Sequence, residues 1–183
     1  MILPIYVYGH PILRKKAVNI EQKDPGLEQL IEDMFETMYH AQGVGLAAPQ
    51  IGNSIRLFVI DSTAFREAYP EAEIFKGAFI NPTILKEYGD DFSFNEGCLS
   101  LPDIHEDVIR KSEIEIEYMD EKGEIKNQTF NGFVARIIQH EYDHLEGQVF
   151  TDKVTPLKKM LLKRKLGDIA TGKTKTNYKT KNK

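Results

Sequence analysis

One short stretch of the chain decides how the rest is interpreted. It reads Gln139-His140-Glu141-Tyr142-Asp143-His144-Leu145-Glu146-Gly147 and contains the pattern His-Glu-x-x-His. On a helix, residues four apart lie one above the other, so His140 and His144 can direct two imidazole nitrogens at one metal ion. Glu141 projects beside them, close enough to move a proton on water at that ion. The alternative is a pair of solvated helix histidines that bind nothing.

The residues around the motif favour a helix. Apolar residues recur at helical spacing, and Gly147 is suited to end the helix. These apolar residues are Phe133, Val134, Ile137, Ile138 and Leu145. Asn131-Gly132 precedes them and is expected to open the helix.

Length and composition describe one globular domain. The chain has 183 residues, of which 41% are hydrophobic and 28% are charged, which suits a single domain with a real core. We assign residues 1–170 to one domain. The start of the chain lacks a basic leader followed by an apolar core, and no run approaches the roughly 20 apolar residues of a membrane span. The sequence therefore predicts a cytoplasmic protein without membrane contact.

Charge is distributed unevenly. From Leu157 to the end there are ten basic residues and one acid, Asp168, so this segment carries +9 and residues 1–156 carry −13 of the formal total of −4. A basic end on an acidic body suggests contact with nucleic acid or another polyanion. The alternative is a solvated tail that keeps the protein soluble. Residues 171–183 are polar and are expected to be disordered.

Periodicity predicts the elements before the motif. A helix is expected over 25–41, with Asp24 as its cap, and a strand over 55–60. Residues 61–77 are expected to form a surface loop, and 78–80 and 83–85 two short strands. His10 is expected at the surface. His40 is expected to interact with a helix dipole rather than with a metal.

Periodicity also predicts the elements that flank the motif. Glu113 to Tyr118 alternates strictly, which predicts a strand with one buried face. Residues 120–123 are expected to form a hairpin turn to a partner strand over 125–130. A last helix is expected to start at Thr155 and Pro156. Its expected apolar side comprises Leu157, Met160, Leu161 and Leu162.

Two further stretches carry candidate functional residues. Gly43-Val44-Gly45-Leu46-Ala47-Ala48-Pro49-Gln50 combines glycines and small residues that let the backbone approach a ligand closely, although a plain helix-to-strand connection is the alternative. Asn95-Glu96-Gly97-Cys98-Leu99-Ser100-Leu101-Pro102 contains the only cysteine. One cysteine forms no intramolecular disulfide, which agrees with a reducing compartment. A lone cysteine is most often a buried apolar residue.

The three stretches together, in this order, resemble the signature motifs of peptide deformylase. The resemblance covers roughly residues 1–165 of the chain. Leu101-Pro102 also fits the family, and some members have a glycine where this chain has Asp103. The resemblance implies that Cys98, His140 and His144 are the protein ligands of one metal ion. Three ligands leave a position for water, as in catalytic rather than structural sites.

The resemblance also implies the reaction. The ion is expected to be Fe(II), with Zn(II) or Ni(II) accepted in its place, and Glu141 is expected to take a proton from water. The Gln50 side-chain amide and the Leu99 backbone N–H are expected to donate to the formyl oxygen. The product is formate, released from the N-terminal formyl-methionine of newly made proteins. Two alternatives are a metallopeptidase that cuts internal bonds and a non-enzymatic module that binds metal or RNA.

Substrate binding and partners follow from the same resemblance. The nascent chain is expected to pair with backbone around Gly43–Gly45 as an added strand. The expected methionine slot comprises Val44, Phe133, Ile137, the ring of His140 and, less directly, Phe94, with plain packing as the alternative. Arg136 is expected at the rim of the slot, paired with an acid, and Glu96 with Arg110. The basic last helix and tail are expected to contact the ribosome surface.

The expected fold class is α+β. Mostly antiparallel or mixed sheets should pack around a central metal-binding helix, with helices near both ends of the chain.

Overall fold

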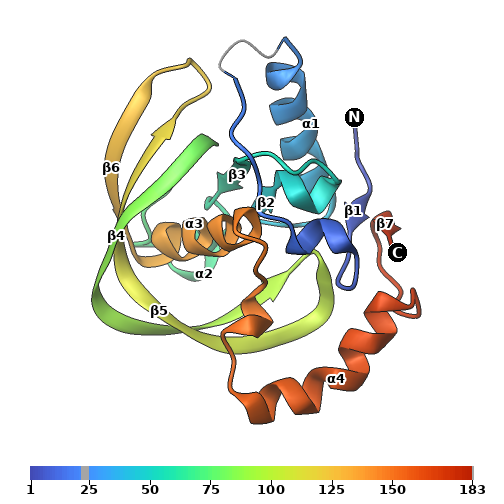
Figure 1. The fold of residues 1–183 in the computed structure, drawn as a ribbon. Coiled ribbons are helices and arrows are strands. Elements are labelled where there is room, and N and C mark those ends of the chain that lie inside the picture. The colour runs from blue at the N-terminus through green and yellow to red at the C-terminus, as the bar shows by residue number, and fades with distance from the viewer. Residues whose placement is uncertain (22–24, 183) are drawn as a thin grey trace.

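The computed structural model describes residues 1–21 and 25–182 and has the predicted α+β class (Figure 1). The strands are β1 (Ile5–Tyr6), β2 (Gly45–Ala47), β3 (Leu57–Asp61), β4 (Lys76–Cys98), β5 (Leu101–Met119), β6 (Ile125–Asn131) and β7 (Thr180–Lys181). The α-helices are α1 (Leu27–His40), α2 (Phe65–Ala68), α3 (Gly132–Leu145) and α4 (Pro156–Ala170). Short 3-10 turns are η1 (Pro11–Arg14), η2 (Ala48–Ile51) and η3 (Phe150–Asp152).

One antiparallel sheet organises the molecule. Its strand order is β2-β3-β4-β5-β6, so each strand pairs with its neighbour in the chain. The long strands β4 and β5 change register at several points along their pairing, and such irregularities bend a strand and increase its twist. The sheet therefore curves around α3, which lies inside the bend (Figure 1).

Two hydrophobic layers fix α3 and α1 on opposite sides of β3. Phe58 and Ile60 pack in the cluster that contains the apolar face of α3. Leu57 and Val59 pack in the cluster that contains α1. Alternate residues of a strand point to opposite faces, so one short apolar strand serves both layers. The helix α3, which carries the His-Glu-x-x-His motif, is consequently packed against the sheet.

Several predicted elements differ in extent. The helix predicted over 25–41 is α1, which starts at Leu27 with Gly26 at its N-cap; the cap expected from Asp24 lies outside the described residues. The loop predicted over 61–77 contains the short helix α2. The two short strands predicted around Asn81-Pro82 are parts of β4, because the pairing skips from Ile80 to Thr83 and the strand continues as a bulge.

The last helix packs by a different face from the one predicted. Leu162, Leu166 and Ile169 are buried against β5 and the segment after α3. Of the expected apolar residues only Leu162 is buried; the other three are Leu157 at 63% exposed, Met160 at 64% and Leu161 at 71%. The reason is spacing, since positions four and seven residues after Leu162 share its face. Within the described residues, no helix combines the length and apolarity needed to cross a membrane.

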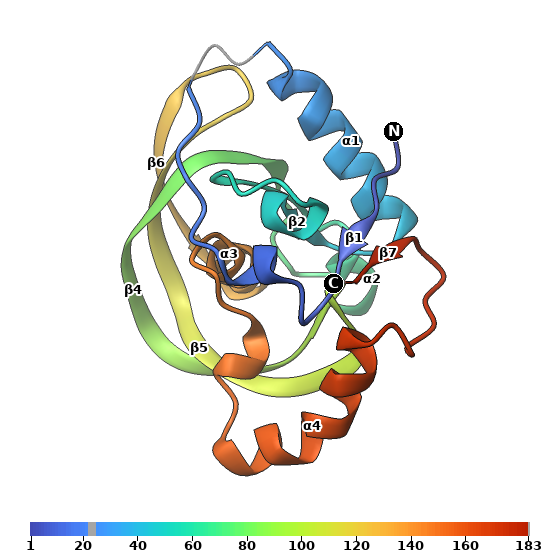
Figure 2. The ribbon, with the colours of Figure 1, turned by 45° about the vertical axis from the view of Figure 1, so that its right-hand side comes forward.

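The prediction of a disordered tail is wrong for residues 171–182. After α4 the chain turns back toward the N-terminus, where β7 pairs in parallel with β1 (Figure 2). Ile5 N donates to Lys179 O at 2.9 Å and Val7 N donates to Lys181 O at 3.1 Å. Polar composition indicated disorder, but backbone pairing with β1 does not require apolar side chains.

Candidate metal centre and substrate cleft

The structure brings the three expected ligands together. Cys98 ends β4, and His140 and His144 lie one turn apart on α3. Their ligand atoms all lie within 4.8 Å of one another. Cys98 Sγ is 3.3 Å from His144 Nε2, and both histidines are buried. Among the described residues, His10 and His40 take no part in this group: His10 Nδ1 accepts from Ile12 N, and His40 ends α1.

Glu141 lies buried beside the three ligands. Its side chain comes from α3, and Oε2 has no hydrogen-bond partner among the described residues. Burial raises the pKa of this carboxyl group to about 7. A carboxylate with a pKa near neutrality is suited to accept and return a proton.

Gly45 makes room for Glu141. A Cβ atom at Gly45 would lie 2.8 Å from Glu141 Cδ and also 2.8 Å from Cγ. Real Cβ atoms do not approach other carbon atoms so closely, because van der Waals repulsion rises steeply. The glycine in this motif therefore has a physical reason: β2 passes directly over the carboxylate.

Replacing Gly45 with alanine is expected to lower turnover by about a hundredfold, because a displacement of about 1 Å at a reacting group costs that much. Steady-state kinetics measures the effect. The matched control is Gly167→Ala in α4, where an added Cβ meets nothing within 4 Å. This control should retain full turnover. Equal rates for both variants and the unchanged chain would show that Glu141 tolerates the added methyl group.

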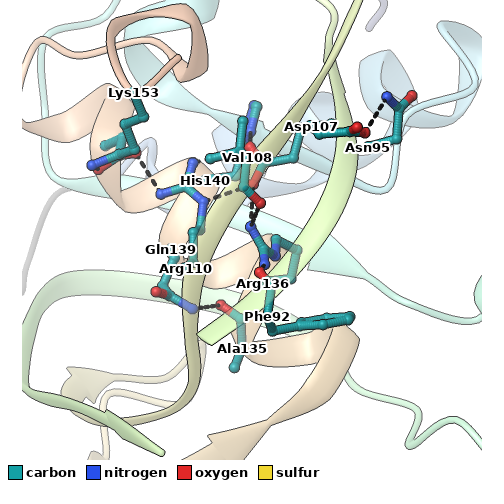
Figure 3. Close-up of polar contacts among 12 residues, drawn as sticks. Phe92, Asn95, Asp107, Val108, Arg110, Ala135, Arg136, Gln139, His140 and Lys153 are labelled. Atoms are coloured by element: carbon teal, nitrogen blue, oxygen red, sulfur yellow. Dashed lines mark hydrogen bonds and ion pairs between the residues drawn. The ribbon is translucent and has the colours of Figure 1, made fainter. Parts of the chain in front are cut away.

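Glu96 connects one candidate ligand, His140, to two arginines. Its carboxylate accepts from Arg110 Nε at 2.7 Å and from Arg136 Nη1 at 2.8 Å. Its Oε2 is also 2.8 Å from His140 Nδ1. Figure 3 shows Arg110, Arg136 and His140 converging between α3 and the β5 strand. A carboxylate on one ring nitrogen orients the imidazole and leaves the other nitrogen for a metal.

The charges in this network are buried and mutually compensated. Glu96 is 4% exposed, Arg110 7% and Arg136 3%. Burial alone would raise the pKa of Glu96, but hydrogen bonds from His140 and Arg110 hold this pKa well below its ordinary range. Arg110 also donates to Asp143 at 2.7 Å. The expected Glu96–Arg110 pair is confirmed, and Arg136 pairs with the same acid but lies in the interior rather than at the rim.

Gln50 contacts the turn after Cys98 directly. Gln50 Oε1 accepts from Ala47 N at 2.8 Å, which orients the amide. Gln50 Nε2 donates to Ser100 Oγ at 3.1 Å and lies 3.6 Å from Cys98 Sγ. Leu99 lies in the turn between these two residues. The amide group of Gln50 is thus fixed beside the sulfur of Cys98.

A cleft of about 860 Å³ opens onto this centre. Val44, Gly45, Ile137 and the oxyanion candidates Gln50 and Leu99 line it. Phe133 is not among the lining residues of the described chain; it stacks on Phe65 at 4.8 Å between ring centroids and meets Phe94 edge-on. Those two rings line the cleft, and Phe133 packs against both of them.

Asp103 and residues 175–178 also line the cleft. Asp103 has a φ of 61°, a left-handed conformation that aspartate tolerates better than most residues. A glycine would adopt it freely, which explains how either residue can follow Leu101-Pro102.

The donor set fits a catalytic metal. One thiolate and two imidazoles are ligands that bind Fe(II), Zn(II) and similar ions. Three protein ligands, with a cleft on one side and an unpartnered buried carboxylate oxygen next to them, leave access for water and a base to act on it. The fold and the site together define a metal-dependent hydrolase with an extended substrate cleft.

Comparison with known proteins gives the family. The family model described as polypeptide deformylase matches residues 2–160. A peptide deformylase of Flavobacterium johnsoniae is 53% identical, covering 99% of this chain and 96% of the relative. A crystal structure of a peptide deformylase from Legionella pneumophila has a TM-score of 0.82 at 39% identity, covering 94% of this chain and 98% of the other. A structure from Synechococcus elongatus in complex with actinonin has a TM-score of 0.77 at 37% identity, covering 93% and 87%.

The chain belongs to the polypeptide deformylase family. It is therefore a hydrolase that removes the formyl group from the N-terminal formyl-methionine of newly made proteins and releases formate. The comparisons favour neither the metallopeptidase nor the non-enzymatic alternative.

Sequence reasoning missed three features of the site. It did not foresee that Glu96 contacts His140, because the two residues are far apart in the chain and lie on different elements, β4 and α3, that only tertiary packing brings together. It did not foresee Ser100 as the partner of Gln50. It also did not place residues 175–178 at the cleft, since a polar tail carries no periodic signal.

Proposed function

We propose that Cys98, His140 and His144 hold one divalent cation, with Fe(II) as the native ion and Zn(II) or Ni(II) as ions that can replace it. The observation that carries this proposal is the convergence of their ligand atoms within 4.8 Å, beside a buried Glu141. When bound, such an ion supplies Lewis acidity that polarises a carbonyl group and acidifies water. The Cys98 thiolate adds negative charge, which moderates that acidity relative to three neutral imidazoles.

The groups around the ion have separate roles in the reaction. Glu141 Oε2, which is free to accept, takes a proton from the attacking water and later returns it to the departing amine. Gln50 Nε2 and the backbone N–H of Leu99 donate to the formyl oxygen as negative charge develops on it. Donors of this kind typically contribute about 3–4 kcal/mol each to stabilising the transition state.

The cleft accounts for an extended peptide. Backbone at Gly43–Gly45 lies along one side of the cleft and is suited to pair with a bound strand. Val44, Ile137 and the rings of Phe65 and Phe94 offer apolar surface next to the centre for the methionine side chain. A formylated N-terminus thus places its formyl carbon between Glu141 and Gln50.

A comparison of two peptide substrates tests this function. Anaerobically purified protein is loaded with Fe(II) and offered formyl-Met-Ala-Ser or an unformylated peptide with internal bonds. Formate release from the first and no cleavage of the second is the expected result. Cleavage of internal bonds without formate release would instead indicate a metallopeptidase.

The surface of α4 suits contact with the ribosome, where formylated nascent chains emerge in the cytoplasm. Lys159, Lys163, Arg164 and Lys165 are exposed on this helix. They lie beside the exposed apolar group Leu157, Met160 and Leu161. A basic surface favours the phosphate backbone of RNA, and exposed apolar side chains add area for packing against a partner.

Replacing Lys163, Arg164 and Lys165 with alanine is expected to weaken sedimentation with ribosomes by at least tenfold, because the main electrostatic attraction is lost. Turnover of formyl-Met-Ala-Ser should stay within twofold. The control variant replaces three acidic residues of β5, Glu113, Glu115 and Glu117, with alanine. This variant should bind ribosomes as the unchanged protein does. Substitution is preferable to truncation, which would also remove residues that line the cleft. Unchanged binding by the basic-residue variant would remove this surface from consideration.

A further inference from the structure

The C-terminal segment returns to the active-site cleft. Lys175, Thr176, Asn177 and Tyr178 all line it. The segment is anchored beyond this point, since β7 pairs with β1 and Asn182 Nδ2 donates to Ile169 O at 2.6 Å near the end of α4. In Figure 2 this stretch runs from the end of α4 up to β7, which lies beside β1. The end of the segment is therefore fixed, and residues 175–178 border the cleft.

Tyr178 connects this segment to the turn after Cys98. Its hydroxyl group donates to the backbone oxygen of Leu99 at 2.8 Å. Its ring is partly buried and packs against the hydrophobic cluster that contains Leu99 and α1. The ring is thereby held in place, so the hydroxyl group reaches the carbonyl at a defined position.

The turn that contains Leu99 is held from three directions. Tyr178 binds the carbonyl oxygen of Leu99, and Tyr8 N donates to the next carbonyl, that of Ser100, at 2.8 Å. Gln50 Nε2 binds the hydroxyl oxygen of Ser100 at 3.1 Å. Fixing the carbonyl group on one side of the Leu99 Cα restricts rotation of the backbone there, and hence the direction of the Leu99 N–H.

We propose that Tyr178 is a positioning residue that aims the Leu99 N–H at the formyl oxygen, so that the C-terminal segment completes the catalytic site. This inference rests on the proposed function, in which Leu99 N–H stabilises the developing negative charge. Preorganised donors contribute because they need no rearrangement as the charge develops. Tyr178, which lies 80 residues after Cys98 in the sequence, then contributes to the geometry of the catalytic site.

The test compares Tyr178→Phe with the unchanged enzyme. The variant keeps the ring and loses only the hydroxyl group, so the fold is retained. The loss of one such hydrogen bond is expected to lower kcat for formyl-Met-Ala-Ser about 3- to 10-fold. KM should stay within twofold, because a donor that acts mainly in the transition state changes kcat and kcat/KM together.

Tyr39→Phe is the matched control. Tyr39 also donates a hydroxyl hydrogen bond, to Asp61 at 2.6 Å, and neither residue is among those that line the cleft. Its kcat should equal that of the unchanged enzyme. Equal kcat for Tyr178→Phe and the unchanged enzyme, or an equal fall in both variants, would overturn the proposal. If the unchanged enzyme releases no formate, the proposed function itself fails, which is a separate result.

Discussion

Replacing Glu141 with glutamine is expected to lower kcat for formyl-peptide hydrolysis by about 10²- to 10⁴-fold, the usual contribution of a positioned general base. Glutamine has nearly the same shape and fills the same buried space. It cannot accept a proton at neutral pH, so the proton from the attacking water has no acceptor at the site. Metal content should be unchanged, because Glu141 is not one of the three proposed ligands. Formate release and metal analysis on the same preparation measure both quantities.

Glu146→Gln is the control for this substitution. Glu146 follows α3 directly and pairs with Arg56 at 2.6 Å and Lys16 at 2.9 Å, away from the residues that line the cleft. Neither ion pair involves a group proposed to take part in the reaction, so kcat of this variant should be unaffected. Full turnover by metal-loaded Glu141→Gln would mean that another group accepts the proton.

Replacing Glu96 with alanine is expected to lower the free energy of unfolding by about 3–5 kcal/mol. The reason is that Arg110 and Arg136 would remain buried without their shared carboxylate, and an uncompensated buried charge has a cost of that size. Metal affinity should also fall about 10- to 100-fold, because His140 loses the partner that orients its ring. Chemical denaturation and metal titration provide the two measurements.

Glu106→Ala is the matched control, since Glu106 is the residue opposite Glu96 in the β4–β5 pairing. Glu106 pairs with Lys158 at 2.7 Å near the surface. Its removal should change the free energy of unfolding by no more than about 1 kcal/mol. Similar losses for the two variants would indicate that the buried network contributes no more than a surface pair.

The local patterns of the sequence predicted the parts of the fold that local physics determines. The spacing of Val134, Ile137, Ile138 and Leu145 identified the buried face of α3, and all four residues are buried. The strict alternation from Glu113 to Tyr118 identified one face of β5. Three separate motifs brought Gln50, Cys98 and His140 to one site because each motif lies on an element whose position the family fold determines.

The parts that sequence analysis missed depend on contacts between distant segments. Nothing local to Glu96 indicates that two arginines and a histidine from other elements surround it. The polar tail is ordered through backbone pairing with β1 and through Tyr178, and neither depends on apolar periodicity. The place of Phe133 in the methionine slot stays a prediction; its ring packs against Phe65 and Phe94, which line the cleft. Side-chain direction at that level follows from tertiary packing.

The central claim is that Cys98 binds the same cation as His140 and His144. X-ray absorption at the metal edge, on anaerobically purified and metal-loaded protein, tests it most directly. We predict one sulfur scatterer at about 2.3 Å, the usual metal–thiolate distance for zinc, and its disappearance in Cys98→Ser. A metal environment of nitrogen and oxygen alone in the unchanged protein would contradict the account.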